Sequence, residues 1–276
     1  MAKYFGFVQF DFAGTLPLAD GRYLAGSPEG GDETVLVLQR LSAPVLGERR
    51  RRRGRSTPAE PEPAPVAITR ATVVRAATPF ENPTDAARWL DQACEAEETV
   101  EELAGEATAT LNRALHAQAV AGADPYGRQL TPEQAERVVL AYGSGEEAAD
   151  GRFTDAREVD LRPRSASRRR KREEELRPQE RVAAVLRGRD QLDACETLLL
   201  RARADLDAGR AREAALQLRI GLEALLTELS GAVDDPAHEK DMATLRERQE
   251  AAASDSTEDT LAICERVLRR RRVLRS

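Results

Sequence analysis

Short hydrophobic runs separated by polar turns occupy the first 75 residues, which is the pattern of β-strands. Alternating or β-branched hydrophobic residues occur in Lys3–Phe12, Arg22–Ala25, Thr34–Leu41 and Val66–Arg75. The interval 47–65 is rich in arginine and proline, and proline cannot donate to a ladder of backbone hydrogen bonds. The pattern predicts a small antiparallel β-sheet in residues 1–78, with a disordered loop at 47–65 between two of its strands.

From about Thr84 the hydrophobic positions follow helical spacing. Asn82 and Pro83 are typical of a helix start, and the pattern predicts one long helix to about Ala121. We expect a kink at Gly105, because a glycine inside a helix costs about 1 kcal/mol. Thr131–Gln134 then has the residues of a capping box with proline at the first helical position. A short helix is therefore expected through Tyr142, and residues 79–142 form the second segment.

Small and apolar residues recur in the long helix at spacings of seven and four. Small residues on one helix face let a second helix approach closely, so we expect this face to contact another helix. The candidate association seam consists of Ala86, Ala93, Val100, Ala107, Leu111 and Ala114.

Residues 143–177 hold few apolar positions, which predicts a linker that is largely disordered and basic in its second half. Residues 178–276 again show helical spacing, with helices expected over Pro178–Asp207, Arg210–Leu229, Pro236–Ala252 and Thr257–Leu274. Gly209 is a typical residue for the short turn of an antiparallel hairpin. The fold class predicted is α+β: a small N-terminal sheet followed by a mainly helical bundle with a hairpin near its C-terminal end.

Composition narrows the class of protein. The chain has 276 residues, of which 41% are hydrophobic and 33% charged, enough for one or two soluble domains with a real core. The longest stretch without a charged residue, Ala114–Ala123, is about half of the roughly 20 residues that cross a bilayer. Gln9 and Asp11 interrupt the apolar start, so no signal peptide and no membrane insertion are expected.

Cysteine usage predicts a reducing compartment. The three cysteines, Cys94, Cys195 and Cys264, are few, far apart and odd in number, unlike a secreted disulfide framework. Leucines flank Cys195 and Cys264 at helical spacing, so we expect both thiols to be buried and inert. The expected location is cytoplasmic.

The net charge of −6 conceals a division of charge along the chain. Three segments, Arg49–Thr57, Arg162–Arg172 and Arg266–Ser276, contain many basic residues and no acid, which leaves the remainder strongly acidic. Such arms either bind nucleic acid or another polyanion, or fold onto the acidic surface of their own chain. The candidate polyanion contacts are Arg49, Arg50, Arg51, Arg52, Arg53, Arg168, Arg169, Arg170, Lys171, Arg269, Arg270, Arg271 and Arg272.

No motif predicts catalysis, and we expect no metal and no cofactor. The spacing Gly-x-Gly-x-x-Ala at 143–148 resembles a phosphate loop, but we expect it to follow a helix, and Glu146 and Glu147 would repel a phosphate. His116 and His238 are the only histidines, and neither lies near other residues at metal-ligand spacing. We interpret His238 as part of a solvated helix start.

These observations favour a non-catalytic cytoplasmic protein, of scaffold or adaptor type, that acts through helix-mediated association with itself or with a protein partner. Two alternatives stay open. One is the binding of nucleic acid or another polyanion through the arginine-rich arms. The other is an enzyme whose site is assembled from distant residues and is not visible in sequence.

Overall fold

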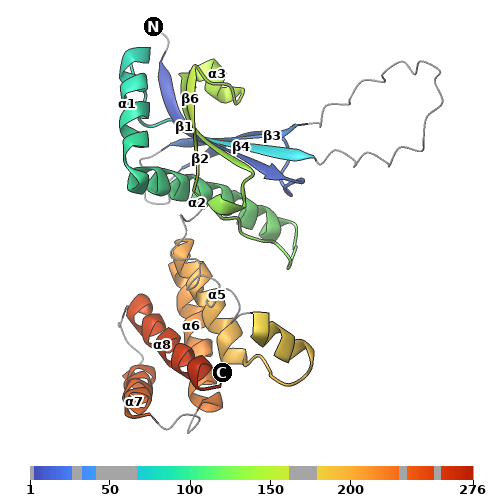
Figure 1. Ribbon diagram of the computed structural model, residues 1–276, viewed down its shortest axis with the longest axis vertical. Coiled ribbons are helices and arrows are strands. Elements are labelled where there is room, and N and C mark those ends of the chain that lie inside the picture. The colour runs from blue at the N-terminus through green and yellow to red at the C-terminus, as the bar shows by residue number, and fades with distance from the viewer. Residues whose placement is uncertain are drawn as a thin grey trace, which may run out of the picture. The chain divides into compact units, whose positions relative to one another are not determined.

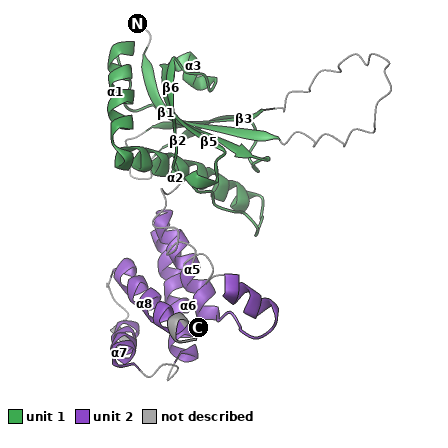
Figure 2. Cartoon of the chain, viewed as in Figure 1, with its two compact units in different colours: residues 1–163 green, residues 164–276 purple. Residues whose placement is uncertain are grey.

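The computed structural model describes residues 3–26, 33–41, 67–161, 179–229, 235–251 and 256–275 (Figure 1). The chain divides into two compact units, unit 1 with residues 1–163 and unit 2 with residues 164–276 (Figure 2). The segments predicted for 1–78 and 79–142, and the first part of the predicted linker, therefore belong to one unit. The predicted loop 47–65 and the rest of the linker, from residue 162, lie outside the described residues.

Unit 1 is built on a six-stranded antiparallel sheet in the order β2-β3-β4-β1-β5-β6. The four predicted strands are confirmed as β1 (Tyr4–Ala13), β2 (Gly21–Ala25), β3 (Thr34–Leu41) and β4 (Ile68–Arg75). The sheet is completed by β5 (Arg137–Ser144) and β6 (Asp155–Val159). The predicted α+β class is confirmed.

The helix predicted for 131–142 is wrong, because this segment supplies a strand. The capping box is present, and the side chain of Gln134 accepts from the backbone N–H of Thr131 at 3.3 Å. It starts only the 3₁₀ turn η1 (Pro132–Gln134), after which the β-branched Val138 and Val139 enter β5. β5 pairs with β1 on one side and β6 on the other, and that pairing outweighs local helix signals.

The predicted linker also begins with regular structure. α3 (Gly145–Ala149) follows β5 directly, and β6 follows α3. Residues 143–161 are therefore part of unit 1 rather than a linker.

Two helices replace the single long helix predicted between 84 and 121. α1 (Pro83–Glu95) begins at Asn82, whose side chain accepts from the backbone N–H of Asp85 at 2.9 Å, as expected. α2 (Glu97–Ala121) follows after one extended residue, Ala96. α2 continues through the exposed Gly105, and the interruption between the two helices lies at Ala96 instead.

The break at Ala96 lets both helices pack on one face of the sheet. The core there contains Val8, Phe10 and Phe12 of β1 together with Leu90 of α1 and Leu111 of α2. The opposite face carries a smaller cluster around Phe7 and Val139, packed against Ala148 of α3.

Every regular element described in unit 2 is a helix. It contains a helix at 179–186, α5 (Ala194–Asp207), α6 (Ala211–Glu228), α7 (Pro236–Ala251) and α8 (Thr257–Arg275). The hairpin of α5 and α6 is confirmed, with Gly209 at φ +71° in its turn. The single helix predicted for Pro178–Asp207 is wrong, because residues 187–193 are not helical and Gly188 has φ +68°.

The core of unit 2 consists of aliphatic side chains and two cysteines. Leu199 of α5, Leu225 of α6 and Leu261 of α8 are almost completely buried. Gly221 permits the close approach of α5 and α6, since a Cβ there would lie 3.0 Å from Leu199 Cδ2 and 3.2 Å from Leu198 Cβ. In the described part of the chain, no helix is both long and apolar enough to span a membrane.

Candidate functional site

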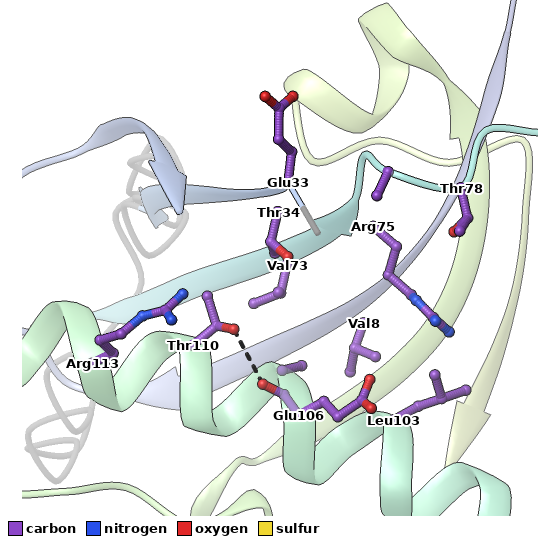
Figure 3. Close-up of a pocket in the computed structure, with 12 residues that line it drawn as sticks. Val8, Glu33, Thr34, Val73, Arg75, Thr78, Leu103, Glu106, Thr110 and Arg113 are labelled. Carbon is purple, nitrogen blue, oxygen red and sulfur yellow. Dashed lines mark hydrogen bonds between the residues drawn. The ribbon is translucent and has the colours of Figure 1, made fainter. Parts of the chain in front are cut away.

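A pocket of about 230 Å³ lies in unit 1 between α2 and the sheet (Figure 3). Its floor is apolar and comes from two layers: Val8 and Val73 from the sheet, and Leu103 and Ala107 from α2. These four side chains are buried. The pocket therefore combines residues from positions far apart in the sequence, which no local motif could reveal.

Four charged residues line the same pocket. Arg75 at the end of β4 is half-buried, while Arg113 of α2, Glu106 of α2 and Glu33 are exposed. The guanidinium groups of Arg75 and Arg113 lie at opposite ends of the pocket (Figure 3). Within the described part of the chain, neither arginine lies within 4.0 Å of a carboxylate oxygen.

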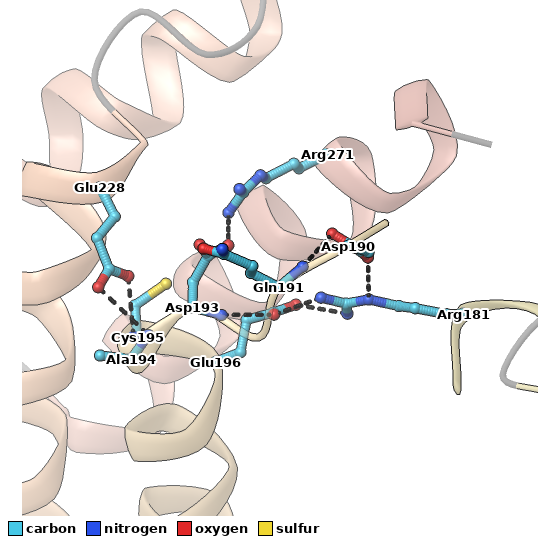
Figure 4. A network of polar contacts seen from close by, with 9 residues as sticks. All are labelled: Arg181, Asp190, Gln191, Asp193, Ala194, Cys195, Glu196, Glu228 and Arg271. Atoms are coloured by element: carbon cyan, nitrogen blue, oxygen red, sulfur yellow. Dashed lines mark hydrogen bonds and ion pairs between the residues drawn. The ribbon is translucent and has the colours of Figure 1, made fainter. Parts of the chain in front are cut away.

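A second polar cluster joins the helices of unit 2 at the N-terminal end of α5 (Figure 4). The Arg181 guanidinium donates to the two carboxylate oxygens of Glu196 at 2.7 and 2.5 Å and to Asp190 at 3.1 Å. Arg271 of α8 donates to Asp193, the N-cap residue of α5. The Glu228 carboxylate accepts from the backbone N–H groups of Ala194 and Cys195 at 3.2 and 3.1 Å.

The charged groups of this cluster join helices to one another, and its one thiol, Cys195, is not activated as a nucleophile. Burial, followed by a hydrogen bond to Glu228, raises the pKa of Cys195 to about 12, so its thiol is protonated at neutral pH. Burial of Glu228 opposes ionisation, but hydrogen bonds from the N–H and thiol of Cys195 and from the N–H of Ala194, together with the charge of Arg271, outweigh it and lower the pKa of this carboxyl. The hydrogen bond to Glu196 raises the pKa of Arg181. Charged groups thereby hold α5, α6, α8 and helix 179–186 together.

Exposed hydrophobic side chains concentrate in unit 2. Among the described residues, six of the ten strongly exposed large apolar side chains lie between 182 and 220: Val182, Leu186, Leu192, Leu200, Leu216 and Ile220. Leu186 is 81% exposed and Leu200 is 72% exposed. Leu216 and Ile220 lie one turn apart on α6, away from the buried Leu218 and Leu222, and Val182 and Leu186 lie one turn apart on helix 179–186.

The residues of the predicted association seam lie in the core of unit 1. Ala86, Ala93, Ala107 and Leu111 are buried there, Ala114 packs against them, and Val100 is half-buried. The face expected to receive another helix instead covers the sheet, because the break at Ala96 brings both helices onto it. Four of the six side chains are therefore covered by the core of unit 1, while Val100 and Ala114 stay partly exposed.

The described part of the C-terminal arginine arm contacts acids of its own chain. Arg270 donates to Asp241 at 2.6 Å, Arg266 donates to Asp241 at 3.3 Å, and Arg271 is the partner of Asp193. Arg269 is exposed. The structure does not describe the side chains of the remaining candidate contacts, which are Arg49–Arg53, Arg168–Lys171 and Arg272. Of the two expectations for the arms, the contacts at 266–271 fit folding onto the chain's own acidic surface.

Two further expectations about single residues are corrected. The segment 143–148 comprises the last two residues of strand β5 and most of α3, so it continues a strand and not a helix. The carboxylate of Glu147 lies at the N-terminus of α3, where a phosphate would have to bind. It accepts from the N–H of Ser144 at 2.8 Å and from Thr154 Oγ1 at 2.7 Å. His238 is only 3% exposed, since the first turn of α7 packs it inside unit 2 instead of leaving it in solvent. Among the described residues, no three His, Cys, Asp or Glu side chains are grouped as metal ligands.

Comparison with known proteins returned no relative: no protein-family model matches the chain, and no curated protein or solved structure is significantly similar to it.

Proposed function

We propose that the chain is a non-catalytic scaffold or adaptor that works by protein–protein association, and that unit 2 supplies the contact surface. The proposal is carried by one observation, the concentration of exposed large apolar side chains between Val182 and Ile220. Neighbouring exposed apolar side chains are typical of interaction sites, whereas isolated ones are common on any protein. Val182 and Leu186, and likewise Leu216 and Ile220, are such neighbours at a spacing of one helical turn.

The arrangement on α6 supports helix-mediated contact in particular. Ala214, Leu218, Leu222 and Leu225 already bury one face of this helix against its own unit. Leu216 and Ile220 lie on the other face at a spacing of four residues, which presents two apolar groups side by side to a partner helix. α6 is thus apolar on two faces, of which its own unit uses one.

The experiment measures the mass of the full chain by light scattering coupled to size-exclusion chromatography, over a range of concentrations. A pull-down with the full chain as bait accompanies it. The double variant Leu216→Glu/Ile220→Glu places charges on the exposed face of α6. The matched control is Val120→Glu, which places the same carboxylate on an exposed apolar position of α2 in unit 1.

We expect the parent chain and the Val120→Glu control to self-associate, or to retain a common partner protein in the pull-down. The double variant should lose that association while keeping its circular dichroism spectrum. A parent chain that is monomeric at every concentration and retains no partner contradicts the proposal. So does an association that the double variant leaves unchanged.

A further inference from the structure

We propose that the pocket between α2 and the sheet binds a small organic monocarboxylate, with Arg75 as the residue that holds the carboxylate. The ligand has a short apolar body and about ten non-hydrogen atoms, which a pocket of this size admits. This binding site is separate from the surface of unit 2 and does not depend on the proposed association.

The apolar floor of the pocket favours a ligand with a hydrocarbon body. Val8, Val73, Leu103 and Ala107 are almost completely buried and offer only hydrocarbon to the space above them. Water over such a floor has few polar partners, so an aliphatic or aromatic body that displaces it gains binding free energy.

Arg75 sets the charge of the ligand. Its side chain is half-buried at the end of β4 and extends over Val8 and Leu103 (Figure 3). Several half-buried guanidinium groups elsewhere in the described chain have carboxylate partners, as Arg70 has in Asp11 at 2.7 Å and Arg181 has in Glu196. No described carboxylate oxygen lies within 4.0 Å of Arg75. A guanidinium pairs with both oxygens of a carboxylate, which is therefore the group that fits.

The other charges restrict the ligand to a single negative charge. Glu33 and Glu106 bring as many negative charges to the lining as Arg75 and Arg113 bring positive ones. A phosphate ester or a dicarboxylate brings a second negative charge into a lining that already holds two glutamates, whereas a monocarboxylate brings only the one charge that Arg75 can pair with. The Glu106 carboxylate lies on the Arg75 side of the pocket, which further disfavours a second negative charge there (Figure 3). Thr78 and Thr110 add hydroxyl groups to the lining.

The probe for the test is 3-phenylpropanoate, titrated into the full chain by isothermal calorimetry and followed by amide NMR shifts. Its neutral counterpart 3-phenylpropan-1-ol and inorganic phosphate are titrated in the same buffer. Arg75→Gln removes the proposed anchor. Arg88→Gln is the matched control, because Arg88 is exposed on α1 and pairs with Asp85 outside the pocket. Ala107→Leu fills the floor without changing any charge.

We expect saturable binding of 3-phenylpropanoate by the parent chain and by Arg88→Gln, with shifts at the pocket residues. Arg75→Gln and the neutral alcohol should each weaken binding at least about tenfold, and Ala107→Leu should weaken it while the chain stays folded. Absence of saturable binding up to about 10 mM overturns the proposal. So does equal binding by Arg75→Gln, or tighter binding of inorganic phosphate.

Discussion

The thiols of Cys195 and Cys264 lie completely buried in the core of unit 2, where burial controls their chemistry. Burial is the main reason that the pKa of each is raised to about 12. Cys94 in α1 is half-buried, and burial raises its pKa as well. The thiolate is the form that reacts with alkylating agents, and its fraction falls about tenfold for each unit by which the pH lies below the pKa.

Iodoacetamide at pH 8 should therefore modify Cys94 first and leave Cys195 and Cys264 unmodified in the folded chain. Adding a denaturant should expose the last two and restore the reactivity of an ordinary cysteine. Peptide mass spectrometry at increasing times measures all three sites in one sample. Rapid modification of Cys195 without denaturant would contradict the burial and would indicate that the N-terminal end of α5 opens in solution.

His238 is the one histidine that the fold buries, and neither of its ring nitrogens has a hydrogen-bond partner among the described residues. Burial is the first cause that lowers its pKa, and Arg270 of α8 is the second. Glu239 and Asp241 of α7 and Asp235 just before it act in the opposite direction but do not outweigh them. The unfolded chain therefore binds a proton at His238 more readily than the folded chain does.

It follows that the free energy of unfolding falls as the pH is lowered through the ordinary histidine range, about 6.5, toward the lower pKa of folded His238. The variant His238→Leu should lose less stability than the parent chain between pH 7.5 and pH 5 (roughly the range in which histidine titrates). Urea unfolding at several pH values measures the difference. His116→Gln is the control, since His116 is exposed, and it should keep the parent's pH dependence. An unchanged pH dependence in His238→Leu would exclude this histidine as the cause.

At the scale of elements, helix 179–186 depends on one arginine. Arg181 reaches from this helix to Glu196 in α5 and to Asp190 in the connecting segment. Val182 and Leu186 are directed to solvent, and the helix has no completely buried side chain, so the Arg181 contacts should contribute much of its attachment. Hydrogen bonds to charged groups contribute about 1.5–3 kcal/mol each, so losing this set should release the helix locally.

We expect Arg181→Ala to increase amide hydrogen exchange in residues 179–186 by at least about tenfold, which corresponds to about 1.4 kcal/mol. Exchange in α6 should change far less. Arg187→Ala provides the comparison, because Arg187 is an exposed arginine just beyond the same helix. Equal exchange in the two variants would mean that packing, and not the Arg181 contacts, holds the helix.

Helices and strands whose own residues favour one structure were predictable from sequence. Those whose structure depends on packing or pairing with distant segments were not. β3 was predicted with its observed bounds, since Thr34–Leu41 is a compact β-branched and leucine run. In β5, Val138 and Val139 fitted the apolar side of a helix equally well, and only pairing with β1 decides between the two structures. No sequence pattern indicated the break between α1 and α2 at Ala96, because alanine favours helix. The break is explained by tertiary structure, since it lets both helices pack on the sheet.

The same distinction holds for the candidate sites. The seam residues Ala86 and Leu111 were recognised as one apolar face, but sequence could not tell a helix partner from a sheet partner. Arg75 and Arg113 were not singled out, because they lie in different elements that only the folded unit brings to one pocket. The exposed Leu216 and Ile220 were not singled out either, since the helical pattern alone does not show that a second apolar face of this helix is left uncovered.

At the scale of the whole molecule, the two units have separate cores, and a single tryptophan in unit 1 allows the unfolding of that unit to be followed by fluorescence. Trp89 is the only tryptophan. It lies over Gly6 of β1, where a Cβ atom would be 2.5 Å from the indole ring, and its ring centroid is 5.6 Å from that of Phe80. Tryptophan fluorescence therefore follows the unfolding of unit 1, whereas the far-ultraviolet circular dichroism signal includes the helices of both units.

This separation predicts the response to a core truncation in unit 2. Leu225→Ala removes a completely buried side chain and should destabilise that unit by about 2–5 kcal/mol. The midpoint of the Trp89 fluorescence transition should stay where it is, while part of the circular dichroism transition moves to lower temperature. Leu111→Ala, at a completely buried position of unit 1, should shift the fluorescence midpoint instead. If Leu225→Ala shifts both signals equally, the cores do not unfold independently, and the two units form one cooperative structure.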